Sequence, residues 1–234
     1  MRKKLLFYSF LFFCALVLSL FFVRTTKEDH PPVIITALPE KKEPLFTSSR
    51  ITDEIASRMK GNSYPKDCEL PLSDLRYLKI HHYGFDQKVH EGELVVHKHL
   101  AHDILKIMKA LYEARYPIEK MHLIDDYQGD DLASMEDNNT SCFNYRRVAN
   151  SSTLSNHAKG LAIDINPLYN PYVRIRNGKT HVEPASALLY VDRSASFSYK
   201  ITEDDLCCKL FKQYGFTWGG DWTSCKDYQH FERP

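Results

Sequence analysis

The sequence predicts an α+β protein, in which a small central antiparallel sheet with flanking helices follows an N-terminal transmembrane or signal segment. Short segments with alternating apolar residues stand between segments with helical spacing, and polar turns separate them. Residues 5–23 form a long apolar run without charge. With 234 residues, 43% of them hydrophobic, the chain is long enough for one domain of ordinary size and a packed core.

The N-terminal segment, residues 1–23, begins with the basic stretch MRKK and continues with the apolar run. About 20 such residues span a bilayer. The basic residues before the run place the N-terminus in the cytoplasm, so the rest of the chain is expected on the other side of the membrane. No small-residue cleavage pattern follows the run, which favours a retained anchor over a signal peptide.

The first half of the remaining chain is expected to hold a linker, a short helix, two strands and a long helix. Residues 24–50 are rich in Pro, Lys and Glu and are typical of a juxtamembrane linker. Apolar spacing predicts an amphipathic helix over 51–61 and the clearest helix of the chain over 101–117. Strands are expected at 75–85 and 92–100.

The second half is expected to alternate strands with loops before a last helix. We divide the chain into an N-terminal extension, 51–90, packed on a main domain, 91–234. The expected elements are strands at 120–127, 143–148 and 162–166, a polar loop at 128–142, an extended insertion at 167–201, a helix at 202–215 with Thr202 as its N-cap, and a final short strand.

Charge and cysteine content exclude some classes of function. The net charge of +1, from 31 basic and 30 acidic residues, does not predict nucleic-acid binding. The cysteines beyond the apolar run lack C-x-x-C spacing, so they do not predict a zinc site. Their number is odd, and their pairing is left open: Cys68, Cys142, Cys207, Cys208 and Cys225.

The stretch SNHAKGLAIDINP, residues 155–167, carries candidate metal ligands. In a strand Ile163 and Ile165 would face the core, and Asp164 would face the other way, exposed in a cleft. A bend at Gly160 would let His157 come back over Asp164. Histidine and aspartate are both zinc ligands. The alternative is an ordinary buried histidine beside a strand that happens to contain an acid.

A third ligand is available near the C-terminus, in the segment DYQH. A catalytic zinc ion takes three protein ligands and leaves one position open. His157, Asp164 and His230 make such a set, and Asp227 is then a free carboxylate that can accept a proton from a zinc-activated water molecule. The other histidines of the chain are interpreted as ordinary surface or partly buried residues.

The two segments resemble a known enzyme family. SNHAKGLAIDIN resembles the S-x-H-x-x-G-x-A-x-D-I signature of the zinc D-Ala-D-Ala carboxypeptidase and L-alanyl-D-glutamate endopeptidase family, and KDYQHFE resembles the closing segment of its endopeptidase branch. The resemblance covers roughly residues 90–234. It implies the hedgehog/DD-peptidase fold with a zinc cleft, one zinc ion per chain held by His157, Asp164 and His230, and Asp227 as general base.

The resemblance also implies an arginine, before the histidine signature, that polarises the scissile carbonyl. Arg146 in FNYRR is the candidate, and Arg147 is the less favoured choice, since neighbouring residues of a strand face opposite ways. Candidate substrate-binding residues are Ser155, Trp218, Trp222 and Tyr228. For Ser155 a turn residue is an equal alternative, and for the aromatic residues core packing is.

The function that follows is a zinc metallopeptidase that hydrolyses a D-amino-acid-containing bond of peptidoglycan stem peptides. Its place would be the bacterial cell envelope, outside the cytoplasm and anchored to the membrane. The alternatives are a non-catalytic zinc-containing protein of the same fold that binds peptide or cell wall, and a scaffold whose function lies in residues 24–90. Whether the D-Ala-D-Ala or the L-Ala-D-Glu bond is cut stays open.

Overall fold

A computed structural model describes residues 43–148 and 151–234, and the chain from Glu43 to Pro234 forms one unit. The expected membrane segment, 1–23, and residues 24–42 of the expected linker lie outside the described residues. None of the helices in the described ranges is long and apolar enough to cross a membrane.

The first sheet contains three antiparallel strands in the order β1-β2-β3. They are β1 (Phe46–Ser49), β2 (Leu75–Tyr83) and β3 (Val89–His97). Residues 46–49 therefore belong to the sheet and not to the expected linker. Between β1 and β2 lie helix α1 (Asp53–Met59) and a single 3₁₀ turn, η1 (Leu72–Asp74). The expected boundary between residues 90 and 91 falls inside β3.

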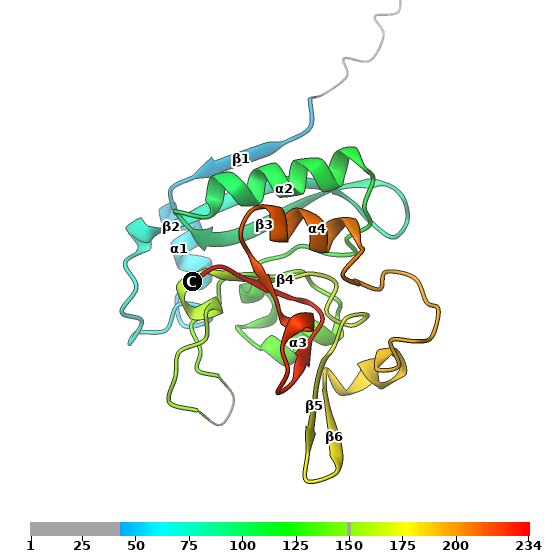
Figure 1. The fold of residues 1–234 in the computed structure, drawn as a ribbon. Coiled ribbons are helices and arrows are strands. Elements are labelled where there is room, and N and C mark those ends of the chain that lie inside the picture. Colours follow the sequence, from blue (N-terminus) through cyan, green and yellow to red (C-terminus); the bar gives the residue numbers. More distant parts are fainter. Residues whose placement is uncertain (1–42, 149–150) are drawn as a thin grey trace, which may run out of the picture. The chain divides into compact units, whose positions relative to one another are not determined.

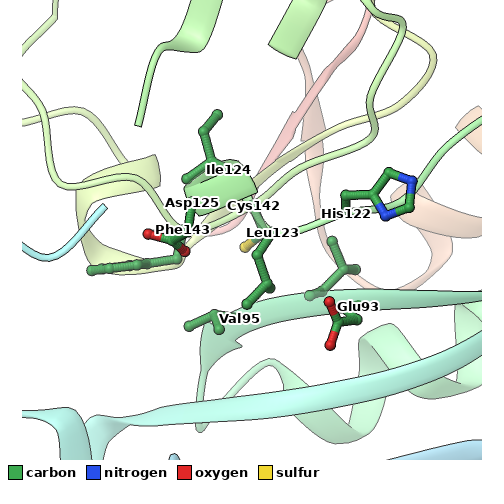
Figure 2. Close-up of a pocket in the computed structure, with 9 residues that line it drawn as sticks. Glu93, Val95, His122, Leu123, Ile124, Asp125, Cys142 and Phe143 are labelled. Atoms are coloured by element: carbon green, nitrogen blue, oxygen red, sulfur yellow. The ribbon is translucent and has the colours of Figure 1, made fainter. Parts of the chain in front are cut away.

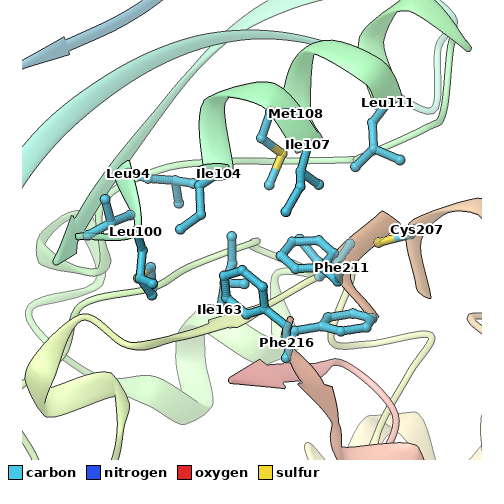
Figure 3. Packing of buried hydrophobic residues seen from close by; sticks show 14 of the residues in the cluster. Leu94, Leu100, Ile104, Ile107, Met108, Leu111, Ile163, Cys207, Phe211 and Phe216 are labelled. Atoms are coloured by element: carbon cyan, nitrogen blue, oxygen red, sulfur yellow. The ribbon is translucent and has the colours of Figure 1, made fainter. Parts of the chain in front are cut away.

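Helix α2 (Ala101–Glu113) lies along this sheet and buries one face (Figure 1). Its apolar residues recur at helical spacing, so Ile104, Met108 and Leu111 meet the core together. The core cluster also takes residues from the second half of the chain (Figure 3). Ile163 of strand β4 (Ala162–Asp164) and Phe211 of helix α4 (Leu206–Gln213) are fully buried in it.

Two further antiparallel sheets complete the unit. One has the order β4-β9-β7, formed by β4 (Ala162–Asp164), β9 (His230–Glu232) and β7 (Thr217–Trp218). The other has the order β6-β5-β8, formed by β6 (Lys179–Glu183), β5 (Tyr172–Arg176) and β8 (Lys226–Asp227). The α+β class is confirmed, but three small sheets replace the single central sheet that the sequence predicts.

Several expected elements are wrong. Residues 120–123 are not a strand and lead into a 3₁₀ helix, η2 (Ile124–Tyr127); the Lys120 and Met121 carbonyls accept from single backbone amides, and the Asn139 side chain pairs with the His122 backbone. Residues 143–148 are also irregular. The expected loop contains helix α3 (Asp131–Glu136), and the expected insertion contains the β5–β6 hairpin and a 3₁₀ helix, η4 (Ala185–Tyr190). Asp205, not Thr202, caps α4.

Candidate metal centre

Three side chains from different elements meet in the interior. His157 begins a 3₁₀ turn, η3 (His157–Lys159), Asp164 ends β4, and His230 begins β9. Asp164 and His230 are directly opposed in the β4–β9 pair, so their side chains share a face of the sheet. The potential ligand atoms of the three residues all lie within 4.8 Å of one another, and together they could hold a metal ion.

The turn before β4 places His157 over that face. The Ser155 hydroxyl accepts a hydrogen bond from the His157 amide at 3.2 Å, which is the turn role that the sequence allowed for it. Gly160 ends the turn with a φ of 66°. A Cβ at Gly160 would lie 2.6 Å from the His97 amide nitrogen, so only glycine lets the turn approach β3 this closely.

The two histidines are oriented by partners outside the group. His157 Nδ1 lies 2.7 Å from the Cys142 carbonyl oxygen, to which it donates, so Nε2 carries the lone pair. His230 Nε2 lies 3.0 Å from the Glu232 carboxylate, which fixes the lone pair on Nδ1 in the same way. Both lone pairs therefore point toward the Asp164 carboxylate.

The distances within the group are those of atoms that converge on one point. His157 Nε2 lies 3.2 Å from Asp164 Oδ2 and 3.2 Å from His230 Nδ1, which lies 3.0 Å from Asp164 Oδ1. When both histidines are neutral, with the tautomers set from outside, three acceptor atoms face one another, and a metal ion would take the place of the proton that His230 Nδ1 otherwise shares with Asp164. A cation satisfies all three at once, so the residues present fit a metal ion.

The group is buried, and its charges are strongly coupled. Asp164 is only 5% exposed, whereas the sequence predicted an exposed ligand, because the side chains of His157 and His230 lie against its carboxylate. Burial alone would raise the pKa of Asp164, but His157 and His230 hold it well below its usual range. Burial opposes protonation of His230, yet hydrogen bonds to Asp164 and Glu232 raise its pKa to about 10.

Asp227 lies on β8, outside the three-residue group. Its Oδ1 atom is buried and has no hydrogen-bond partner among the described residues. Burial raises the pKa of Asp227 to about 7, and the charge of Asp164 adds to the rise. Gly219, which begins the 3₁₀ turn η5 (Gly219–Asp221), makes room for it, since a Cβ there would lie 2.7 Å from the Asp227 Cβ.

The two candidate arginines differ in their surroundings. Arg146 Nη2 binds the Asp131 carboxylate of α3 at 2.6 Å, and its Nε is buried without a partner in the described chain. Arg147 is exposed and donates to the Ser152 carbonyl. Arg146 is therefore the better placed of the two to present a fixed guanidinium to a ligand.

The aromatic candidates are spread between the core and the metal-ligand group. Trp222 is half-buried, and its ring centroid lies 5.2 Å from that of His230. Trp218 is 5% exposed and belongs to the core cluster, with its indole N–H donating to the Tyr228 carbonyl at 2.9 Å. The Tyr228 ring is half-buried and lies 4.3 Å from the Arg193 guanidinium.

A small pocket is lined by residues of β3, by residues 122–125 and by Cys142 and Phe143 (Figure 2). None of His157, Asp164 and His230 lines it, so the pocket is separate from the metal-ligand group. The two are linked through Cys142, whose carbonyl oxygen accepts from His157 Nδ1.

Sequence reasoning missed the outer partners of the group. Glu232 stands two residues after His230 on one strand, so both side chains face the same way, and this spacing is a signal that could have found it. Asn156 orients the same carboxylate, donating from Nδ2 at 2.8 Å. The Cys142 carbonyl carries no sequence signal. Asp221, the acid of the nearby segment GGDW, is not one of these partners and pairs with Lys212 at 2.8 Å.

The fold and the site together define the class of protein: an α+β unit with a buried His-Asp-His group that could hold a metal ion. Residues 149–233 match the family described as D-alanyl-D-alanine carboxypeptidase, and this part of the chain is a domain of that family. The resemblance predicted from the sequence motifs is thereby confirmed. No curated protein and no solved structure is similar enough to the chain to count as a match.

Proposed function

We propose that the chain is a zinc peptidase that hydrolyses a D-amino-acid-containing bond in peptidoglycan stem peptides. One observation carries the proposal: His157, Asp164 and His230 converge, while the Oδ1 atom of Asp227 is buried without a hydrogen-bond partner among the described residues. A protein that only bound zinc would have no use for a second acid with a free, buried oxygen. The family match over 149–233 supports the substrate class.

The metal-ligand group and Asp227 divide the chemistry between them. Zinc held by His157, Asp164 and His230 would supply a Lewis acid that lowers the pKa of a water molecule and polarises a carbonyl oxygen. Asp227 accepts the proton of the attacking water and returns it to the leaving amine. Its buried Oδ1 atom, which has no hydrogen-bond partner among the described residues, suits this role because it is free to accept a proton.

Arg146 is proposed to stabilise the oxygen of the scissile carbonyl as negative charge develops on it. Such a donor contributes a few kcal/mol, provided that it is held in place before the reaction. The ion pair with Asp131 supplies that restraint, because it ties the guanidinium to the start of α3.

The proposed location is the bacterial cell envelope, outside the cytoplasm and at the membrane. Its support is the uncharged run from Leu5 to Val23 and the basic residues before it. Fractionation of cells into membrane and soluble parts, with and without residues 1–23, tests this location directly.

The test of function uses the purified protein with defined muropeptides. We expect one zinc ion per chain and cleavage, and Asp227→Asn should retain the zinc ion but lose turnover by two or more orders of magnitude. Full cleavage by Asp227→Asn, or a wild-type protein that takes up no zinc, would overturn the proposal. Mass spectrometry identifies the bond: loss of one D-Ala indicates a carboxypeptidase, and release of a longer peptide indicates an endopeptidase.

A further inference from the structure

The β5–β6 hairpin is the segment whose residues the proposed chemistry does not use. Figure 1 shows the two strands projecting together from the unit, and residues 174–181 are all exposed. The strands are joined by Asn177 and Gly178, whose φ angles of 52° and 71° are those of a two-residue hairpin turn. This tight turn keeps the register fixed up to the tip, where Arg176 pairs with Lys179.

The register gives the hairpin two different faces. Arg174 is paired with His181 and Arg176 with Lys179, and residues two apart on a strand share a face, so all four lie on one side. The opposite side carries Val173, Ile175, Thr180 and Val182. One face of the ribbon is therefore basic and the other is mainly apolar.

The basic face continues to Asp227. Strand β5 also pairs with β8, and Tyr172 is directly opposed to Asp227. Tyr172 precedes Arg174 by two residues, so Asp227, Tyr172, Arg174 and Arg176 project from the same side of the three-stranded sheet. At about 3.3 Å per residue, Arg174 stands about 7 Å and Arg176 about 13 Å along the strand from the Asp227 pair.

The cations of this face are not held in ion pairs within the part of the chain that the structure describes. Among the described residues, no carboxylate forms an ion pair with Arg174, Arg176 or Lys179. Glu183, the acid of this face, is paired with Tyr172 at the base of the hairpin. Like charges directly opposed across two strands destabilise a hairpin, so the Arg176–Lys179 pair favours a bound anion.

We infer that the basic face of the β5–β6 hairpin binds carboxylates of the substrate peptide on one side of the scissile bond. Because an extended peptide advances at the same rate as a strand, these carboxylates lie about two to four residues from the bond that is cut. Arg174, Arg176 and Lys179 are then specificity residues, separate from the catalytic group. The inference rests on the proposed function, since Asp227 marks where the reaction takes place.

The test compares two double variants that change the charge of the hairpin by the same amount. Arg176→Gln/Lys179→Gln removes two positive charges from the basic face, and Ile175→Glu/Thr180→Glu adds two negative charges to the other. The probes are synthetic peptides ending in D-Ala-D-Ala, with Glu or Gln two to four residues from the expected cleavage site. Turnover and fluorescence anisotropy are measured for each pair.

We expect wild-type protein to bind the Glu peptide about three- to tenfold more tightly than the Gln peptide, the range for two partly exposed ion pairs. Arg176→Gln/Lys179→Gln should abolish that preference through KM with kcat unchanged, and the control should keep it. The inference would be overturned if Arg176→Gln/Lys179→Gln weakened binding of the Glu and Gln peptides equally. It would also be overturned if the control variant lost the preference for the Glu peptide. A third contrary result would be a variant Arg176→Gln/Lys179→Gln that binds both peptides like the wild type but no longer binds phosphatidylglycerol vesicles, because the basic face would then bind a membrane surface.

The outcomes separate this inference from the proposed function. A protein that prefers the Glu peptide and loses the preference in the variant, but cleaves neither peptide, keeps the inference and loses the proposed function. If the protein cleaves both peptides equally well and the variant has no effect, the proposed function is kept and the inference about the hairpin is lost.

Discussion

Gly219→Ala tests whether the position of Asp227 matters for turnover. A Cβ at residue 219 would lie 2.5 Å from the Asp227 carbonyl oxygen and 2.7 Å from its Cβ, whereas ordinary contact begins at 3.4 Å. The two segments must therefore move apart by about 0.9 Å. A displacement of this size at a reacting group can lower the rate about 100-fold, because the geometry for proton transfer is lost.

The zinc content of Gly219→Ala should stay at the wild-type value, because the three atoms nearest the added methyl group all belong to Asp227 and not to a candidate ligand. We expect kcat/KM for a muropeptide to fall between about 10-fold and 100-fold, measured by chromatography of the products, with unchanged circular dichroism.

Gly84→Ala is the matched control for Gly219→Ala. A Cβ at residue 84 meets the side-chain ends of His90 and Asp86 at 2.7 Å and 2.8 Å, but both side chains are at the surface and can move. This variant should retain full activity. If Gly219→Ala is folded, zinc-loaded and within twofold of wild type, the position of Asp227 does not limit the reaction and its role as general base is refuted.

Three further predictions concern the metal, pH and the core. Glu232→Gln should lower zinc affinity about 10- to 100-fold in chelator competition, while Asp221→Asn leaves it unchanged; equal affinities would show that Glu232 does not support its histidine. Burial lowers the pKa of His82 to about 4, so the unfolded chain takes up the proton first as the pH falls below about 6.5. The stability that His82 contributes above that pH should therefore decline by up to about 3 kcal/mol toward pH 4. Urea unfolding of the wild-type protein should show this loss, and urea unfolding of His82→Gln should lack it. Phe211→Ala should cost about 3–5 kcal/mol in urea unfolding at pH 7, and a loss below 1 kcal/mol would mean that the core repacks.

Local patterns predicted the elements whose partners are close in sequence. Helix α2 and strands β2 and β3 carry apolar spacing that matches one buried face, so their types followed from the residues. The segment at 120–127 has the composition of a strand, but the backbone of His122 is paired with the side chain of Asn139 and not with a neighbouring strand, a contact that spacing cannot reveal. Helix α3 did have a local signal, since Asp130 caps it.

In the candidate metal centre, too, some features could be predicted from the sequence and others depend on three-dimensional neighbours. The sequence motifs named His157, Asp164 and His230, which the structure brings together, because their residue types and the order of the motifs carry information. Burial of Asp164 and the unpartnered Oδ1 atom of Asp227 depend on β9 and Gly219. These arrangements need three-dimensional neighbours, so spacing along the chain did not predict them.

The family match and the hydrophobic core do not have the same extent. The match begins at residue 149, yet Leu78 and Ile104 from before it share one buried cluster with Ile163 and Phe211 from within it. The Cys142 carbonyl, which sets the tautomer of His157, also lies before it. A fragment limited to the matched stretch would expose to water the apolar side chains that now pack against β2 and α2. Core substitutions in those elements are therefore expected to weaken the metal centre without contacting any of its ligands.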